Sequence, residues 1–195
     1  DGRRFRLSPR LLTVARTWLD GSPLWTFALG PMRAVAEALG ESCSAAVLSD
    51  TDVVYVARVP GESIISIALH VGTRLPAYCT SMGRVLLAGL DPQSRALRLE
   101  RTVIEARTTR TLTDRAALAE SVARAASDGY AVVDEELEIG VRSIAVPVRD
   151  RSGATVAAIN VSTQSARHSV EAMRERFLPL LRDAALRIED VVALQ

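Results

Sequence analysis

Two blocks of short apolar segments constrain the fold of this chain more than any other feature of its sequence. Polar turn residues separate neighbouring segments, as at Ser49 to Asp52 and at Asp150 to Gly153. Short segments joined by such turns predict antiparallel hairpins. We therefore expect a central, mainly antiparallel six-stranded sheet, with strands over residues 44–48, 53–59, 64–70, 130–135, 141–149 and 155–163.

Segments with helical periodicity precede, separate and follow the two blocks. Their apolar residues recur at helical spacing between typical start and stop residues. Pro31 and Pro179 each lie inside such a segment, which predicts a kink or break there. The expected helices cover residues 8–20, 24–39, 81–90, 92–99, 113–128 and 170–195, the second with an apolar stripe of Phe27, Met32, Val35 and Leu39 and the fifth capped by Thr113.

Several expected strands are nearly unbroken apolar runs, such as 144–148 and 156–159. Strands of this kind are buried on both faces. The fold class is therefore expected to be α+β, with helices covering both faces of the sheet. A sheet covered in this way can hold a small ligand between one face and its helices.

The bulk composition argues against several classes of protein. The chain has 195 residues and a formal net charge of +1, so the domain as a whole is not built to grip phosphates. No apolar run approaches the roughly 18 residues of a membrane helix and no signal peptide is recognisable, so we expect a cytoplasmic protein. Cys43 and Cys79 are too few for a disulfide framework and are interpreted as buried thiols.

Motifs for catalysis or metal binding are not recognisable. Neither histidine, His70 or His168, lies in a motif that presents a nucleophile, and the sequence has no nucleophile elbow, Walker loop or dinucleotide fingerprint. The carboxylates between Asp134 and Glu138 could form a catalytic pair, but a solvated loop or strand edge is favoured. We therefore expect no catalytic residue, no metal and no cofactor, and we expect that the protein is not an enzyme.

The segment from Gly72 to Ala88 contains the best candidate for a binding site. Pro76 favours an extended chain, which leads into a helix that begins at Thr80 and Ser81. The free amides and the positive end of the helix dipole attract anions at such a start, and Gly83 would let a ligand approach the backbone closely. The alternative is that Thr80 or Ser81 simply caps its own helix.

Small and polar side chains share faces of the expected strands and would complete this site. The period of two places them in three sets, namely Ile64, Ser66, Ala68 and His70; Val141, Ser143 and Ala145; and Val156, Ala158, Asn160 and Ser162. Small residues with sparse polar groups suit a small ligand with a polar head. Arg58 stands in apolar company and could pair with an anionic ligand, although an internal partner such as Glu41 or Asp52 is at least as well supported.

Several short segments, spread in order over nearly the whole chain, carry a resemblance to a known family. They are Glu41–Ser44, Val54–Arg58, Gly72–Pro76, Thr80–Ala88, Gly129–Tyr130 with Glu135, Gly140–Pro147 and Ala157–Ser162. Together they resemble the IclR family of bacterial transcription regulators. The stretch from Arg74 to Arg84 is most similar to the branch that controls aromatic-acid (β-ketoadipate pathway) catabolism.

The resemblance implies a GAF/PAS-like effector-binding domain over residues 23–195, preceded by a connector over residues 1–22. The connector would come from a winged helix-turn-helix domain, which we expect to be missing because the chain begins at Asp1 without an initiator methionine. Operator DNA would be the partner of that missing domain, and the protein would form a homodimer or tetramer.

The resemblance also implies which residues bind the effector. These positions are Ile64, Ser81, Met82, Val133, Val141, Ser143, Asn160 and Ser162. Relatives that bind short keto acids can carry an acidic residue at the position of Val133 and tiny residues at those of Ser81 and Met82, so a different effector shape is expected here.

The functional hypothesis is a sensor of a small carboxylate, an aromatic-acid or β-ketoadipate pathway metabolite. Two alternatives stay open at this point. One is an oligomerisation domain with a vestigial pocket, which would be filled by large apolar side chains. The other is a hydrolase that uses Ser81 with a distant histidine.

Overall fold

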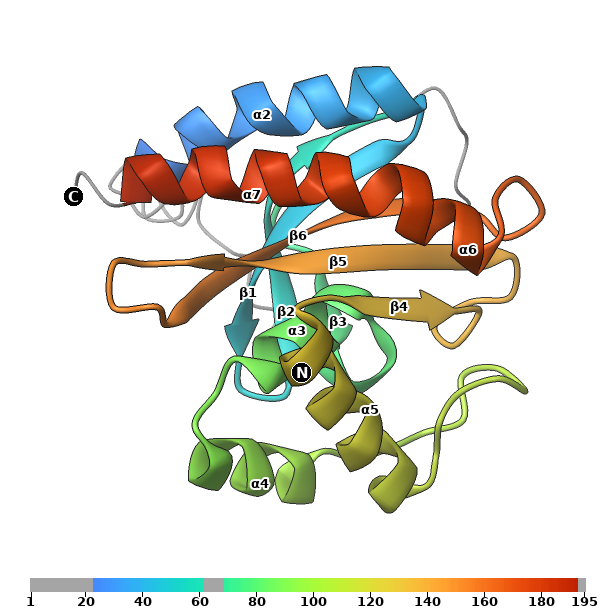
Figure 1. Cartoon of the computed structure of the whole chain (residues 1–195). Helices are drawn as coiled ribbons and strands as arrows, with labels where there is room; N and C mark the ends of the chain where they lie inside the picture. Colours follow the sequence, from blue (N-terminus) through green and yellow to red (C-terminus); the bar gives the residue numbers. More distant parts are fainter. Residues whose placement is uncertain (1–22, 62–68, 193–195) are drawn as a thin grey trace, which may run out of the picture.

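The computed structural model describes residues 23–61 and 69–192, with a six-stranded sheet at its centre (Figure 1). The strands are β1 (Ser42–Ser49), β2 (Asp52–Val59), β3 (Arg74–Pro76), β4 (Ala131–Asp134), β5 (Val141–Arg149) and β6 (Thr155–Gln164). They lie in the order β3-β2-β1-β6-β5-β4, and every neighbouring pair is antiparallel. The prediction of a six-stranded antiparallel sheet is confirmed.

The two predicted hairpins form and meet in the middle of the sheet. In the β5–β6 turn, the Asp150 carboxylate accepts hydrogen bonds from the backbone N–H groups of Ser152 and Ala154, which fixes the turn. Strand β1 of the first hairpin pairs with β6 of the second, from Ser42 opposite Ser162 to Ala46 opposite Ala158. This pairing joins the two halves of the chain into one sheet.

One edge of the sheet differs from the sequence expectation. The strand predicted at 64–70 lies mostly outside the described residues, and Leu69 and His70 are not in a strand. The described edge strand is β3, which ends at Pro76, the residue expected to favour an extended chain. The Ala77 N–H bonds to the Thr51 carbonyl at 2.9 Å, and residues Ala77–Cys79 then close a 3-10 turn that leads the chain into the next helix.

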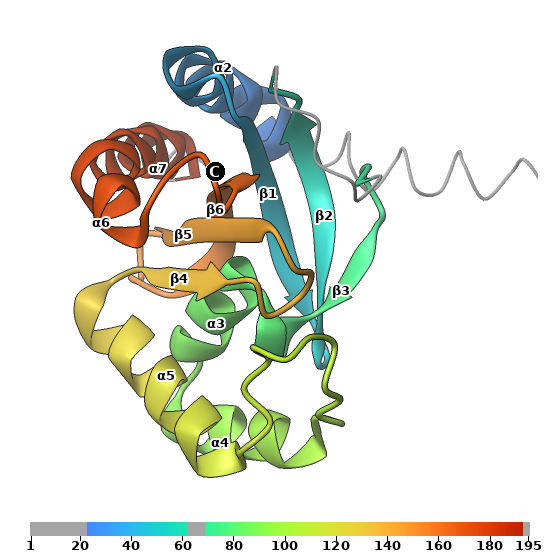
Figure 2. The same ribbon diagram turned by 90° about the vertical axis from the view of Figure 1, so that its right-hand side faces the viewer.

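Helices cover both faces of the sheet, as the apolar strands predict (Figures 1 and 2). On one face α2 (Pro23–Leu39) and α7 (Leu178–Val192) lie side by side, and on the other α3 (Ser81–Ala88) and α5 (Arg115–Asp128) pack, with α4 (Pro92–Arg101) outside them. Each face has its own core: Ile144, Ile159, Phe177 and Leu181 belong to the first, and Tyr78, Met82, Leu87 and Leu118 to the second. Burial of each large apolar side chain contributes roughly 1.5–3 kcal/mol. No helix in the described part of the chain is both long and apolar enough to cross a bilayer.

Helix α2 continues through Pro31 without a break. Met32 and Val35 are buried and Leu39 is half-buried, as expected, whereas Phe27 is 56% exposed. The buried positions follow the helical period from Trp25, and Phe27 lies on the other side of the helix. The expectation that Phe27 belongs to the buried stripe is therefore wrong.

Two helix boundaries differ from or add to the sequence expectation, and the prediction that Thr113 caps the fifth helix is wrong. Helix α5 is capped by Asp114 and not by Thr113, because the Asp114 carboxylate accepts from the Ala117 N–H at 2.8 Å. The C-terminal helical segment consists of α6 (Val170–Ala172), a π-helical turn (Met173–Phe177) and α7. The π turn interrupts the regular hydrogen bonding just before Pro179, where the sequence predicts a bend.

Candidate ligand-binding site

The floor of the candidate site is the sheet face that packs against α3. The antiparallel register aligns side chains from neighbouring strands into rows across this face. One row consists of Ser42, Ser162, Ser143 and Val133, and the next of Arg58, Ser44, Asn160 and Ala145. The structure therefore brings together residues that the sequence placed on separate strands.

The polar groups of the floor are incompletely satisfied. The Asn160 side-chain amide donates to Ser162 Oγ at 3.1 Å, and Asn160 is only 3% exposed. The other end of the amide, Oδ1, and the nearby Ser42 Oγ are buried without a hydrogen-bond partner in the described part of the structure. An unsatisfied buried polar atom costs about 1–3 kcal/mol, and this face carries two such atoms in the described part of the structure.

The N-terminus of α3 lies against this floor and is capped by Thr80. Thr80 Oγ1 accepts from the Gly83 N–H at 3.2 Å, and the hydroxyl donates to the Pro76 carbonyl at 3.1 Å. Thr80 thus caps its own helix, as the alternative interpretation held. The first-turn amides of Ser81 and Met82 have no acceptor within the helix, and Ser81 Oγ is buried without a partner among the described residues. The cap therefore leaves donors at the helix start.

Gly83 and Met82 take part in packing. A Cβ on Gly83 would lie 2.1 Å from the Ala77 carbonyl oxygen, so the close contact between α3 and the preceding 3-10 turn requires glycine. Met82 is completely buried in the core on the α3 face. Neither residue contributes to the wall of the cavity described below, and their roles as ligand contacts stay predictions.

A small cavity of about 30 Å³ lies between the floor and the start of α3. Five residues of the predicted site line it: Val133, Val141, Ser143, Asn160 and Ser162. The remaining lining comes from Tyr55, Leu69, Cys79, Thr80 and Leu137. The volume exceeds the roughly 10–15 Å³ that one water requires but is far below that of ordinary ligand pockets, about 300–1,000 Å³. The predicted residues Ile64 and Ser66 lie outside the described part of the chain.

Some of the lining residues that the sequence analysis missed had a recognisable sequence signal, and others had none. Thr80 and Cys79 stand in the segment that was singled out, and only their orientation was unknown. Tyr55 reaches the floor because the β1–β2 register shifts between Ala45 and Ala46, which no periodic pattern reveals. Leu137 lies in the connection between β4 and β5, where side chains have no regular period.

Arg58 lies on the floor side of the sheet, directly opposite Ser44. Its guanidinium donates to Ser44 Oγ at 3.3 Å, and in the described residues it makes no ion pair with Glu41 or Asp52. Glu41 is paired with Arg167, and Asp52 with Arg74. The internal partners considered for Arg58 are therefore paired elsewhere, and among the described residues its charge has no carboxylate partner.

The ionisable groups that line the cavity are neutral at physiological pH. Burial raises the pKa of the Cys79 thiol to about 11 and the pKa of the Tyr55 phenol to about 12, although the nearby Arg58 opposes the shift of Tyr55. Among residues 23–61 and 69–192, no carboxylate lines the cavity. With Arg58 on the floor and the positive end of the α3 dipole above it, the electrostatics favour an anion.

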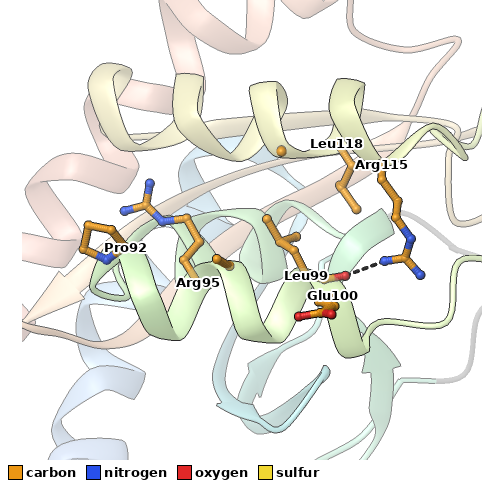
Figure 3. Close-up of a pocket in the computed structure, with 8 residues that line it drawn as sticks. Pro92, Arg95, Leu99, Glu100, Arg115 and Leu118 are labelled. Atoms are coloured by element: carbon orange, nitrogen blue, oxygen red, sulfur yellow. Dashed lines mark hydrogen bonds between the residues drawn. The ribbon is translucent and has the colours of Figure 1, made fainter.

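A larger groove of about 460 Å³ lies between α4 and α5 (Figure 3). It is lined mainly by apolar side chains, including Leu99 and Leu118. Its two arginines serve the protein itself: Arg95 donates to the Ala88 and Leu90 carbonyls, and Arg115 to those of Leu99 and Thr102. These bonds satisfy the ends of α3 and α4. Arg95 Nε is buried without a partner among the described residues, and Glu100 also lines the groove.

The histidines do not join the site. His168 lies near Glu41, with 3.7 Å between Nε2 and Oε1, and its ring packs edge-on against Phe177. His70 is exposed and follows residues outside the described part of the chain. Within residues 23–61 and 69–192, no group of three or more His, Cys, Asp or Glu side chains is placed to hold a metal ion.

Comparison with known proteins places this chain in a family. Residues 17–190 match the profile of the bacterial transcriptional regulator IclR C-terminal domain. The chain belongs to this family. The resemblance inferred from the short motifs is thereby confirmed, together with the effector-domain fold.

The most similar relatives of this IclR-type domain include regulators of aromatic catabolism. The chain is 44% identical over 186 residues to the Pca regulon regulatory protein of Pseudomonas putida. The match covers 95% of the chain but 64% of that relative, so the chain spans just under two thirds of the relative's length.

Two solved structures of similar domains contain aromatic acids. One is an IclR homologue from Microbacterium hydrocarbonoxydans complexed with 4-hydroxybenzoate, with a TM-score of 0.83 and 30% identity, covering 96% of this chain and 75% of that one. The other is a double mutant of the PobR inducer-binding domain from Acinetobacter complexed with 3-hydroxybenzoic acid, with a TM-score of 0.79 and 31% identity. The match covers 86% of this chain and 98% of that one.

Proposed function

We propose that this IclR-type domain binds a hydroxylated aromatic carboxylate in the cavity between α3 and the sheet, and thereby controls a bacterial transcription regulator. One observation carries the proposal: Asn160 Oδ1, in the cavity lining, is buried without a partner in the described structure. The same holds for Ser42 Oγ, opposite the lining residue Ser162, and for Ser81 Oγ, which follows the lining residue Thr80, although neither serine lines the cavity itself. Buried polar groups in native proteins are nearly always hydrogen-bonded. A ligand that satisfies these atoms explains why they are left open.

The chemistry of these three atoms suggests the ligand's functional groups. The hydroxyls of Ser42 and Ser81 can donate, as can the first amides of α3, and a carboxylate accepts from donors of this kind. Asn160 Oδ1 can only accept, so it requires a donor from the ligand, such as a ring hydroxyl. Arg58 adds a positive charge on the floor and is the proposed second partner of the anion.

The relatives support the same class of effector. Solved structures of two similar domains contain 4-hydroxybenzoate and 3-hydroxybenzoic acid, and the Pseudomonas putida relative is a Pca regulon regulator. Each of these acids combines a carboxylate with a hydroxyl on an aromatic ring. The proposed binding residues, besides Arg58, are the predicted set of Ile64, Ser66, Ser81, Met82, Gly83, Val133, Val141, Ser143, Asn160 and Ser162.

The effector signal would reach DNA through parts of the regulator upstream of this domain. We propose that residues 1–22 belong to the connector, that the DNA-binding domain contacts the operator, and that the protein acts in the cytoplasm as a homodimer or tetramer. A coupling free energy of about 1–3 kcal/mol between effector and operator binding is enough for a useful switch.

Two alternative functions have less support. A serine hydrolase would need a base hydrogen-bonded to its nucleophile, but Ser81 Oγ has no hydrogen-bond partner among the described residues. A vestigial pocket would be filled by large apolar side chains, whereas this one retains serines and an asparagine. Both observations favour a binding domain that is not an enzyme.

Isothermal titration calorimetry with 4-hydroxybenzoate, protocatechuate, β-ketoadipate and benzoate tests the proposal. We expect the hydroxylated aromatic acids to bind most tightly, and Ser143→Trp to abolish binding because the indole fills the cavity. Arg151→Trp, in the exposed β5–β6 turn, is the matched control and should bind like the wild type. Absence of binding by all four acids, or unchanged binding by Ser143→Trp, would contradict the proposal.

A further inference from the structure

The cavity is too small for the effector proposed for it. About 30 Å³ holds one or two water molecules, whereas an aromatic acid has a benzene ring and a carboxylate. Binding therefore requires that some of the lining moves. The identity of the moving side chain decides how large an effector the domain accepts.

Most of the lining is held in place. The floor residues Ser143, Asn160 and Ser162 are small and lie in the paired strands β5 and β6. Thr80 is fixed by its capping bonds to Gly83 and Pro76. None of these side chains can open space for a ring without breaking the sheet or the helix start.

Tyr55 is 3% exposed within the α3-side core, whereas Leu69 and Leu137 are half-buried at its edge. Leu69 directly follows residues outside the described part of the chain, so the described contacts bear on Leu137. Leu137 lies in the connection between β4 and β5 and lines the cavity. It packs on the edge of the α3-side core instead of within it. A leucine in this position can leave the cavity by rotation of its side chain at small cost, because its other surroundings are partly solvent.

The backbone around Leu137 is firmly anchored. Glu136, its neighbour, forms a buried ion pair with Arg84 at 2.5 Å between Oε2 and Nη2. Glu135 accepts hydrogen bonds from Ser165 Oγ at 2.7 Å and from the Gly140 N–H at 2.9 Å, which closes the connection on itself. The anchoring means that the side chain of Leu137 yields to the ligand, whereas the connection keeps its shape.

We infer that Leu137 is the size gate of the effector site, filling in the free domain part of the space that the aromatic ring occupies in the complex. This inference rests on the proposed function. Leu137 thereby sets an upper limit on ring substituents: 4-hydroxybenzoate fits once the side chain rotates, and an acid with a further methoxy group does not.

Titration of two acids into matched variants tests this role. Leu137→Ala should bind 4-hydroxy-3-methoxybenzoate at least about tenfold more tightly than the wild type, because one carbon-sized group in a closed pocket is worth roughly 10–200-fold. Its affinity for 4-hydroxybenzoate should change less than its affinity for the methoxy acid, because Leu137 already vacates the space of the ring in the wild type. Ile139→Ala, which truncates an exposed side chain of the same connection, should match the wild type for both acids.

Further variants keep the test decisive if Leu137→Ala folds poorly. Leu137→Val should show a smaller gain for the methoxy acid, and Leu137→Phe should weaken 4-hydroxybenzoate binding. Suppose that the wild type binds 4-hydroxybenzoate. If no Leu137 variant then changes the ratio of the two affinities, or if Leu69→Ala is the only variant that changes it, Leu137 is not the gate, and the proposed function is unaffected. If the wild type binds neither acid and Leu137→Ala also binds neither, the proposed function itself fails.

Discussion

Arg84 and Glu136 form a buried ion pair, with 2.5 Å between Nη2 and Oε2. Their side chains are 3% and 9% exposed. Arg84 Nε also donates to the Tyr78 carbonyl at 3.2 Å, and Glu136 Oε2 accepts from the Leu112 N–H at 3.2 Å. The pair therefore joins α3, the β4–β5 connection and the segment before α5 into one unit beside the proposed effector cavity.

Removing one partner of this pair should destabilise the domain strongly. Glu136→Gln and Arg84→Met each leave the other group without its counter-charge, for which we expect a loss of about 3–5 kcal/mol in the free energy of unfolding. Urea denaturation measures the loss. Arg124→Met is the control, because it breaks the exposed Arg124–Glu120 pair and should cost only about 0.3–0.5 kcal/mol. Equal effects of Arg84→Met and Arg124→Met would show that burial of the first pair has no energetic consequence.

Glu135 should make the stability of the domain depend on pH in the acid range. Hydrogen bonds from Ser165 and from the Gly140 N–H, together with the charge of Arg110, hold the pKa of Glu135 below its ordinary 4.5. A depressed pKa contributes stability that is fully present above 4.5 and is lost as the pH falls through the lower pKa of the folded state.

The variant Glu135→Gln isolates this contribution. Urea titrations of the wild type and variant between about pH 3 and pH 7 should give a stability difference that is largest near neutrality and shrinks below the ordinary pKa. Other acids with lowered pKa values, such as Asp150, affect both proteins equally and cancel in the difference. A difference that stays constant over this range would argue against the assigned role of Glu135.

Periodicity in the sequence was sufficient for five of the six strands and most helices, and for four of the residues that line the cavity. The strand residues Val141, Ser143, Asn160 and Ser162 follow from the period of two, because an antiparallel register converts a pattern along each strand into rows across the sheet. Val133 came from the family resemblance alone. Periodicity does not predict the orientation of side chains in connections between strands, so it could not identify Leu137 as a lining residue.

The carboxylates between Asp134 and Glu138 show that local sequence patterns also fail to predict burial that depends on distant residues. Composition favours a solvated loop for Glu135 and Glu136, and for Glu136 this interpretation is wrong, since it is buried at 7% exposure. Its burial depends on Arg84, which is 52 residues distant in the chain. Long-range pairs of this kind do not appear in any local pattern, and neither does the size of a cavity that such pairs enclose.

The thiols should be unreactive in the folded domain. Burial raises the pKa of Cys79 to about 11 and that of Cys43 to about 12, and the thiolate is the reactive form. At pH 8 only about one Cys79 in a thousand is ionised by this measure, so iodoacetamide should modify neither residue natively and both in urea. At higher pH, 4-hydroxybenzoate should slow modification of Cys79, which lines the cavity, relative to Cys43. Mass spectrometry measures the extent of modification of each thiol. Rapid labelling of Cys79 in the native domain would contradict its buried placement.

Gly83 should tolerate no side chain, because of packing rather than because of a ligand. A Cβ there would lie 2.1 Å from the Ala77 carbonyl oxygen and 2.3 Å from the Ala77 Cα, and neither backbone atom can move without distorting the 3-10 turn. Gly83→Ala should therefore lower the free energy of unfolding by about 1–3 kcal/mol or more.

Gly30 in α2 provides the matched control. Nothing lies within 4 Å of a Cβ built on Gly30, which is exposed within the helix. Gly30→Ala should raise stability by about 0.5–1 kcal/mol, since alanine loses less backbone entropy in a helix. Thermal unfolding of the two variants should give melting temperatures on opposite sides of the wild-type value. If Gly83→Ala were as stable as Gly30→Ala, the close contact between α3 and the turn that leads into it would not exist in solution, and the position of the helix start above the floor would have to be reconsidered.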